Sequence, residues 1–254
     1  MKKVVFIIFT FILLTCAMTV MAYADEPGVT ILLYHDISPA YNIKDALVHT
    51  SPQRFDEHLC ALSENGYNVI SFQQYIQYTK GDASLPENPV IITFDDGYSS
   101  VYYSAYPILT KHNMNATVFV ISGLMGFNDT DYPHFTWEQA EEMESSGLID
   151  IQSHSNFHYN ATEIPYERLI LELRKSKYDI ETRLHKTCNI LAFPYGEYDD
   201  SELMAAVNAG FEVVARTHDS GTNRKSDGLY HLNRLFVHGT QTGDDLIKMI
   251  RTNN

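Results

Sequence analysis

Short apolar runs alternate with helical stretches along almost the whole chain, and this alternation constrains the fold more than any other feature. Strands are expected at residues 29–34, 68–70, 89–94, 116–121, 148–152, 190–193, 212–215 and 232–236. Strand–helix alternation favours a parallel sheet covered by helices. With about seven such units, we expect one α/β domain, a distorted (β/α) barrel of about seven strands.

Helices are expected between these strands, and several carry start signals. Ser51 precedes Pro52, while Ser71 and Thr136 are each followed three residues later by glutamine, the spacing of a capping box. Further helices are expected at residues 99–112, 165–185, 199–209 and 243–250.

The N-terminus has the pattern of an export signal. Lys2 and Lys3 precede an apolar run, and Ala22-Tyr23-Ala24 is a small-x-small cleavage site. We therefore expect residues 1–24 to be a signal peptide, residues 25–254 to form a single domain, and the protein to be secreted or at the cell surface. An uncleaved anchor is the alternative.

The charge balance excludes one class of partner. The net charge is -14, and loss of residues 1–24 removes two lysines and no acid, which makes it -16. A strongly acidic domain is a poor nucleic-acid binder. We expect a monomer that contacts membrane only through its export signal.

Polar residues follow four of the expected strands. These are His35 and Asp36, Asp95 and Asp96, His154 and His158, and Tyr195 with Gly196. Because barrel enzymes place their chemistry at the carboxyl ends of strands, we expect these residues to form one site.

Two of these pairs suggest a metal centre. Adjacent carboxylates at Asp95 and Asp96 repel, so they need a cation or a shared proton, although a helix cap is the simpler reading of a single aspartate. His154 and His158 have i, i+4 spacing, a weak signal alone. One carboxylate with two imidazoles, leaving positions open to water, is typical of a catalytic metal site.

Three segments together resemble a known family. They are Thr93-Phe94-Asp95-Asp96-Gly97-Tyr98, His154-Ser155-Asn156-Phe157-His158 and Phe193-Pro194-Tyr195-Gly196. They are similar to the first three motifs of the NodB-type polysaccharide deacetylases (carbohydrate esterase family four), and the resemblance spans roughly residues 29–240.

The resemblance implies a role for each matching residue. Asp95 would be the general base, and Asp96, His154 and His158 would hold a divalent metal, usually zinc, with cobalt or nickel as alternatives. The backbone N–H of Tyr195 would help to stabilise the oxyanion. An amide is a poor electrophile, so a metal that polarises its carbonyl addresses the main barrier.

The sequence departs from the common family pattern in two places. Ala192 stands where the third motif usually has an arginine, and the late Leu-x-His element is missing in clear form. Both departures resemble the poly-N-acetylglucosamine deacetylases, which carry a segment like Tyr34-His35-Asp36. That resemblance implies that His35 is the general acid, with His238 as the rival, and that Arg234 pairs with Asp95.

We therefore expect a metal-dependent hydrolase that removes N-acetyl groups from poly-β-1,6-N-acetylglucosamine or another N-acetylated cell-envelope polysaccharide. The alternatives are a decayed glycan-binding module, suggested by Ala192, and an O-acetyl (xylan) esterase. Asp36 could orient a catalytic imidazole, although neighbouring strand residues point to opposite faces. Substrate specificity is expected in loops such as residues 123–135. Cys60 and Cys188 are expected to be free thiols, and a disulfide between them is the alternative.

Overall fold

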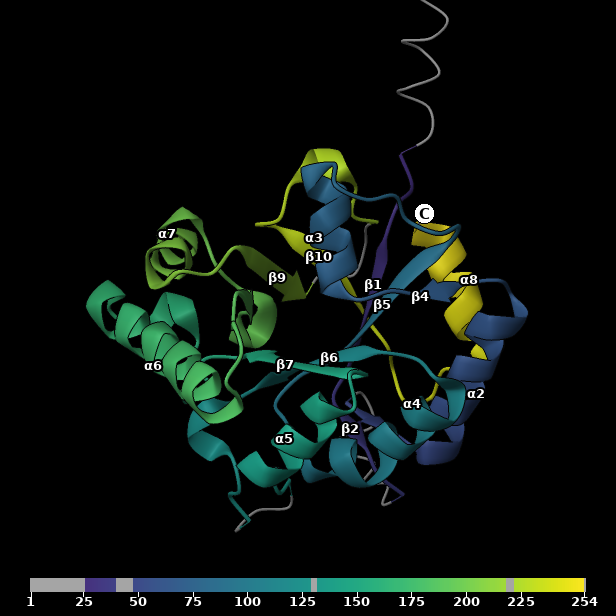
Figure 1. Cartoon of the computed structure of the whole chain (residues 1–254), viewed down its shortest axis with the longest axis horizontal. Coiled ribbons are helices and arrows are strands. Elements are labelled where there is room, and N and C mark those ends of the chain that lie inside the picture. The colour runs from purple at the N-terminus through teal and green to yellow at the C-terminus, as the bar shows by residue number, and fades with distance from the viewer. Residues whose placement is uncertain (1–25, 40–47, 129–131, 218–221, 254) are drawn as a thin grey trace, which may run out of the picture.

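The computed structural model describes residues 26–39, 48–128, 132–217 and 222–253. The expected signal peptide, residues 1–24, lies outside them. Eight parallel strands form one sheet in the order β1-β10-β9-β8-β7-β6-β5-β4, and an additional pairing of β1 with β5 closes it. Helices surround the strands on the outside (Figure 1). The predicted (β/α) barrel is confirmed.

The elements have these bounds. The main strands are β1 Thr30–Tyr34, β4 Asn68–Val69, β5 Pro89–Phe94, β6 Ala116–Val120, β7 Ile149–Ser153, β8 Ile190–Ala192, β9 Val213–Thr217 and β10 Leu232–Phe236. A separate pair is β2 Asp36–Ile37 with β3 His49–Thr50. The α-helices are α2 Pro52–Glu64, α3 Phe72–Lys80, α4 Tyr106–His112, α5 Trp137–Ser145, α6 Tyr166–Leu184, α7 Asp200–Ala209 and α8 Gly243–Asn253.

The barrel is distorted where β5 has three partners. One edge of β5 pairs with β1 from Val90 to Phe94. The other edge is shared, with β4 at the amino-terminal end and β6 at Thr93 and Phe94. Seven strands therefore close the barrel, and the short β4 pairs with the part of β5 that precedes its contact with β6.

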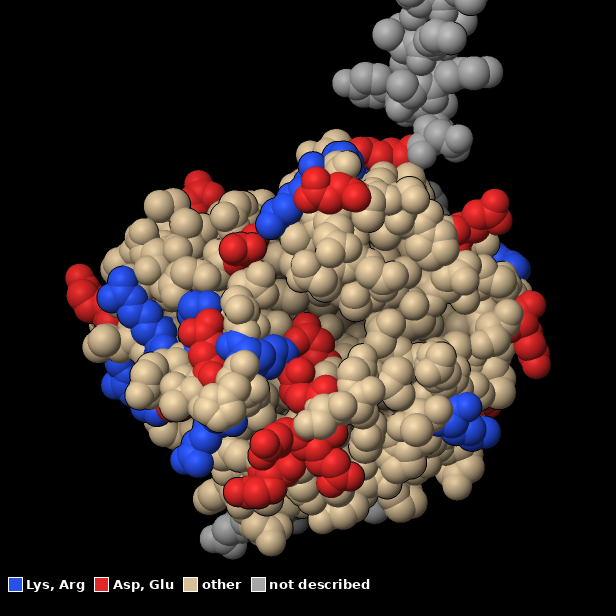
Figure 2. Space-filling view, viewed as in Figure 1, with Lys and Arg blue, Asp and Glu red and all other residues tan. Residues whose placement is uncertain are grey.

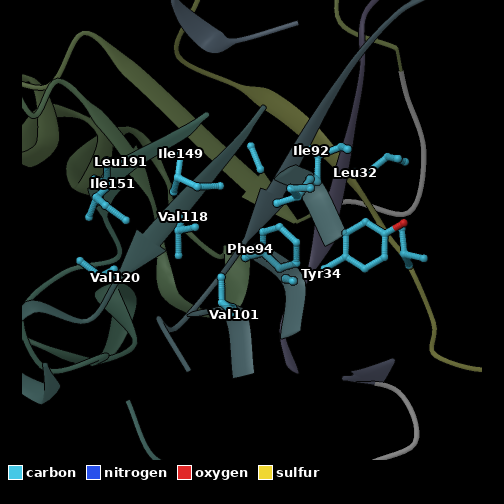
Figure 3. Close-up of a cluster of buried hydrophobic side chains, with 14 of the residues drawn as sticks. Leu32, Tyr34, Ile92, Phe94, Val101, Val118, Val120, Ile149, Ile151 and Leu191 are labelled. Carbon is cyan, nitrogen blue, oxygen red and sulfur yellow. The ribbon is translucent and has the colours of Figure 1, made fainter. Parts of the chain in front are cut away.

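Alternating side chains build two separate apolar clusters. Leu32, Ile92 and Val118 point outward into the layer between strands and helices (Figure 3). Their neighbours Ile31, Ile91 and Phe119 belong to a second cluster inside the barrel. This period of two is what a strand requires, and it fixes which residues can face the interior.

The interior cluster also receives α3. Phe72, Tyr75 and Ile76 of this helix are buried in it, and the Phe72 ring meets Phe119 edge-on at 6.1 Å. α3 therefore closes the end of the barrel from which β1 and β5 start, away from the carboxyl ends of the strands. Its expected capping box is present, with Ser71 accepting from Gln74 N–H.

The expected helix at residues 99–112 is only partly an α-helix. Val101–Ala105 is a π-helix (η2), in which the N–H of Tyr106 donates to the carbonyl of Val101, five residues back. Pro107 explains the difference, since it has no amide N–H and its ring would clash with the carbonyl four residues earlier.

Other expectations can be compared directly with the structure. Cys60 and Cys188 are free, and burial raises the pKa of the Cys188 thiol to about 12. No helix in the described ranges is long and apolar enough to cross a membrane.

A short turn after β8 brings the chain tightly against β9. Gly196, in the 3-10 turn Pro194–Gly196 (η5), has φ +72°, and a Cβ added there would lie 2.5 Å from the backbone nitrogen of Thr217. Gly147 has nearly the same φ, +73°, but a Cβ there would have no heavy atom within 4 Å.

This pair predicts a difference in stability. Gly147→Ala should lower the free energy of unfolding by about 1 kcal/mol, the cost of a left-handed alanine. Gly196→Ala should lower it by about 3 kcal/mol or more, because the backbone of β9 must also move. Urea unfolding of both variants measures the difference, and equal losses would show that the close approach to β9 is unimportant.

Candidate active site

A buried ion pair lies at the carboxyl end of the barrel interior. Arg234 on β10 is fully buried and Asp95, directly after β5, is 2% exposed. The guanidinium donates to both carboxylate oxygens, at 2.6 Å and 2.8 Å. Two parallel N–H···O contacts fix the carboxylate in direction as well as position. The pairing of these residues that the sequence predicted is present, and their catalytic roles stay predictions.

Other groups hold the guanidinium in place. Its Nε donates to the carbonyl of Arg216 at 3.3 Å, and its Cζ lies 5.2 Å from the centre of the Phe119 ring. A buried charge of this kind is tolerated only when it is paired and hydrogen-bonded. Both conditions are met here.

The ion pair decides the charge of Asp95. Burial by itself would raise the pKa of this carboxyl, but the charge and the hydrogen bonds of Arg234 oppose burial, and the pKa lies well below its usual range. Asp95 is therefore ionised at neutral pH.

The expected metal ligands converge beside this pair. Ligand atoms of Asp96, His154 and His158 all lie within 4.8 Å of one another. Asp96 Oδ1 is 3.5 Å from Nε2 of His154 and 3.4 Å from Nε2 of His158. It is buried and has no hydrogen-bond partner among the described residues.

The two histidines present the nitrogen that a metal needs. Nδ1 of His154 lies 2.7 Å from the carbonyl of Ala192, and because a carbonyl only accepts, Nδ1 carries the proton. Nε2 then keeps a free lone pair, as in metal sites with an oriented imidazole. Burial, and then the neighbouring His154, lower the pKa of His158, which keeps that ring neutral near neutral pH.

Unusual backbone angles bring these side chains together. Asp96 has φ 69° and His158 has φ 58°, both in the left-handed region. Asp96 leaves the strand at this point, so its carboxylate reaches the same site as Asp95 although strand neighbours point to opposite faces.

These residues fit a divalent metal. An orphaned buried carboxylate oxygen and two imidazole lone pairs form an open three-ligand set of the catalytic type. A second ligand group, Asp56, Cys60 and His112, fits less well, since Lys111 Nζ already lies 2.8 Å and 2.9 Å from the Asp56 carboxylate oxygens.

Two tyrosines lie at the rim of the triad. Tyr195 has φ 63° and is 62% exposed, and its ring meets the His158 ring at 4.8 Å. The proposed oxyanion role of its N–H stays a prediction. Burial, and then the charge of Asp96, raise the pKa of Tyr98.

The two candidate acids share one neighbour. The rings of His35 and His238 lie 5.2 Å and 5.0 Å from the Phe236 ring, and each has a buried Nδ1 without a partner among the described residues. His35 directly follows Tyr34, whose carbonyl accepts a hydrogen bond from the N–H of Asp95 at 3.0 Å. The geometry therefore favours His35, and its role stays a prediction.

Asp36 does not orient His35. Its carboxylate lies 2.5 Å from Nδ1 of His49 and accepts from Ser100 at 2.5 Å. Asp36 belongs to the β2–β3 pair, and its carboxylate binds His49 of that pair instead.

One residue near the site was not predicted. His134, in the loop before α5, is 7% exposed, and its pKa is lowered by burial although Asp96 opposes this. A single histidine in a loop has no spacing or periodicity that could reveal it. The only hint was the expectation that residues 123–135 carry specificity.

Charges of both signs are spread over the visible surface. On the face in Figure 2, lysines and arginines lie among acidic side chains rather than in a continuous basic patch. Acidic side chains gather where α5 lies, a helix that carries Glu138, Glu141, Glu142 and Glu144.

Loss of the buried guanidinium should destabilise the metal-free protein in a pH-dependent way. Arg234→Met should lower the free energy of unfolding at pH 7 by about 3–5 kcal/mol, because a buried carboxylate loses its partner. The lowered pKa of Asp95 stabilises the wild type above the unfolded value of about 3.9, and this contribution is lost as pH falls. In the variant, burial raises the pKa of Asp95. The difference in the free energy of unfolding between wild type and Arg234→Met should therefore become smaller as the pH is lowered toward about 4.

Arg216→Met provides the matched control. Arg216 is half-buried on β9 and its Nε donates to the neutral Asn233 at 2.8 Å. Its loss should cost about 1 kcal/mol with little change between pH 7 and pH 4. Urea titrations at the two pH values test both variants, and a pH-independent loss in Arg234→Met would contradict the assigned ion pair.

Comparison with known proteins agrees with this site. Residues 82–214 match the family model described as polysaccharide deacetylase. YxkH of Bacillus subtilis (strain 168), assigned to the polysaccharide deacetylases, is 31% identical over 213 residues, which are 84% of this chain and 72% of that protein. A poly-β-1,6-N-acetyl-D-glucosamine N-deacetylase of Staphylococcus aureus (strain MRSA252) is 25% identical over 198 residues, 74% of this chain and 67% of that protein.

A solved structure shares the fold. The Streptococcus pyogenes deacetylase PplD, in complex with acetate, superposes with a TM-score of 0.79 at 24% identity and covers 89% of this chain and 99% of its own. The family match spans the segment with both aspartates, both triad histidines and the Phe-Pro-Tyr-Gly turn. The chain belongs to the polysaccharide deacetylase family.

Proposed function

We propose that this chain is an exported, zinc-dependent deacetylase of poly-β-1,6-N-acetylglucosamine. One observation carries the proposal: an ionised Asp95, fixed by Arg234, lies beside an open set of three metal ligands. The set combines one carboxylate with two imidazoles, which suits zinc, and cobalt or nickel would bind the same donors.

The proposed reaction is hydrolysis of an acetamide. When bound, the metal would polarise the acetamide carbonyl and lower the pKa of the attacking water. The carboxylate of Asp95 accepts one proton of that water while the water oxygen bonds to the acetamide carbonyl carbon. Arg234 uses one lone pair on each carboxylate oxygen, so further lone pairs remain to accept the proton.

Cleavage of the carbon–nitrogen bond requires a proton for the leaving amine. His35 is the proposed donor, because it directly follows Tyr34, whose carbonyl accepts a hydrogen bond from the N–H of Asp95 at 3.0 Å. Acetate and a free glucosamine nitrogen are the products, and the proton given up by water is balanced by the proton delivered to the amine.

The choice of polymer and place rests on two supports. The Staphylococcus aureus relative is named as a poly-β-1,6-N-acetyl-D-glucosamine N-deacetylase. Lys2, Lys3 and the small-x-small site at Ala22-Tyr23-Ala24 support export, which would bring the enzyme to a cell-surface glycan.

The argument for a decayed glycan-binding module no longer holds. That alternative came from the missing arginine at Ala192, but Arg234 contacts both oxygens of Asp95. The guanidinium is therefore present, supplied by a different strand.

Substitution of the base should separate chemistry from metal binding. With zinc present, Asp95→Asn should lower kcat for acetate release from N-acetylglucosamine oligomers by about 100-fold or more. Its zinc affinity, measured by calorimetry, should change far less than that of Asp96→Asn, which removes a ligand and should lose about 10–100-fold or more. Retained acetate release by Asp95→Asn would refute the base assignment, and unchanged zinc binding by Asp96→Asn would refute the metal site.

Two substrates can identify the general acid. His35→Asn should lower acetate release from the oligomers by about 100-fold, because the amine must leave protonated. Hydrolysis of 4-nitrophenyl acetate, whose phenolate leaves unprotonated, should fall much less. His238→Asn is the matched control, and the opposite pattern between the two variants would transfer the role to His238.

A further inference from the structure

A cavity that the proposed chemistry does not use adjoins the metal triad. It has a volume of about 780 Å³ and lies between the β2–β3 pair and the loop before α5. Tyr98, two residues after the proposed ligand Asp96, lines the cavity together with His134. The N–H of Phe135, the residue after His134, donates to the carbonyl of Gly97, the residue after Asp96, at 3.2 Å. Any molecule in the cavity would therefore lie next to a group bound at the metal.

His134 forms part of the cavity wall and has unused hydrogen-bonding capacity. The residue is 7% exposed, and neither ring nitrogen has a partner among the described residues. A buried polar group without a partner is costly, so it calls for an explanation. A ligand hydroxyl or amide in the cavity would supply the missing partner.

The His134 ring is held in position. Its backbone N–H donates to the carbonyl of Phe127 at 2.9 Å, and the residue forms an antiparallel bridge with Tyr98. The two rings also lie 5.3 Å apart. The imidazole is therefore oriented before any ligand arrives, which reduces the entropy lost on binding.

The charge of the wall limits what can bind. Of the described residues that line the cavity, Asp36 is the only acid and none is lysine or arginine. Asp36 is 5% exposed and is held by His49 and Ser100. No lysine or arginine of the described lining would offset the repulsion between an anionic ligand and this carboxylate. A neutral group or an ammonium group would not be repelled.

The rest of the lining suits a sugar. Tyr98, Tyr103 and Tyr132 supply aromatic surface, and the rings of Tyr98 and Tyr132 lie 5.2 Å apart. Serine hydroxyls and the amides of Asn128 and Gln139 add donors and acceptors. Apolar faces combined with a few placed polar groups are typical of small-molecule sites.

We propose that this cavity binds the hexosamine unit next to the one being deacetylated, with His134 as the residue that selects it. The unit is neutral or carries a free amine, and a unit that bears a carboxylate is disfavoured. This inference rests on the proposed function, which it deepens by separating a plain glucosamine polymer from one with acidic units.

Kinetics on substrates of different length test the role of His134. His134→Phe keeps an aromatic ring but loses both nitrogens, so KM for N-acetylglucosamine oligomers should rise roughly tenfold, about the value of one good hydrogen bond. The ratio of kcat/KM for the oligomers to kcat/KM for 4-nitrophenyl acetate should fall by a similar factor. His134→Gln, which keeps a donor and an acceptor, should recover part of the loss and also guards against misfolding of the first variant.

His231→Phe is the matched control. His231 is exposed, stacks on Tyr198 and lies outside the cavity lining. Its replacement should therefore leave kcat/KM unchanged for both the oligomers and 4-nitrophenyl acetate. Equal losses on oligomer and ester in His134→Phe would overturn the proposal, because they would show that His134 acts through the metal triad.

Charged oligomers test the selection itself. Wild-type kcat/KM should be at least roughly tenfold lower when the units alternate with ones that carry a lactyl carboxylate. Equal rates on the two polymers would overturn the selection.

Calorimetry with Asp95→Asn separates the two proposals, because it reads oligomer binding without turnover. Binding that weakens in Asp95→Asn/His134→Phe supports the cavity even if the wild type releases no acetate, an outcome that would reject the proposed function alone. Binding that is unaffected by His134→Phe would reject the cavity.

Discussion

The site depends on one interaction, the double contact between Arg234 and Asp95 inside the barrel. The two residues are 139 positions apart in sequence and come from β10 and the end of β5. They meet only because β1 pairs with both of those strands and so closes the sheet. In an open sheet with β10 at a far edge, each charge would be buried without its partner. The free-energy cost of two unpaired buried charges would be comparable to the whole free energy of unfolding of an ordinary domain.

Regular and irregular backbone contribute different parts of this site. The alternation of β5 turns Thr93 and Asp95 inward while Phe94 packs outward. Asp96 would also point outward if the strand continued, but its left-handed φ of 69° ends the strand and returns its carboxylate to the site. Two adjacent acids can therefore take separate positions, one against a guanidinium and one against two imidazoles.

The sequence predicted features that follow local rules. Period-two alternation located the strands, caps located α3 and α5, and polar residues after strands located the triad. It could not predict that α3 would close the barrel, since an amphipathic helix has the same pattern inside or outside. It also missed His134 and the Asp36–His49 contact, because a loop residue and a long-range pair have no periodic signature. The π turn before Pro107 shows a local rule, proline chemistry, overriding a correct helix prediction.

The position of the arginine has a wider consequence. The family pattern has this arginine at the position of Ala192 on β8, whereas in this structure Arg234 lies on β10, two strands away. Inward positions of a closed barrel all converge on one axis, so a long side chain from either strand can reach the same carboxylate. Ala192 and Ala215 are small members of the interior cluster. An arginine absent from a motif is therefore weak evidence for lost catalysis in this fold, because the charge is required by Asp95 and not by any one strand.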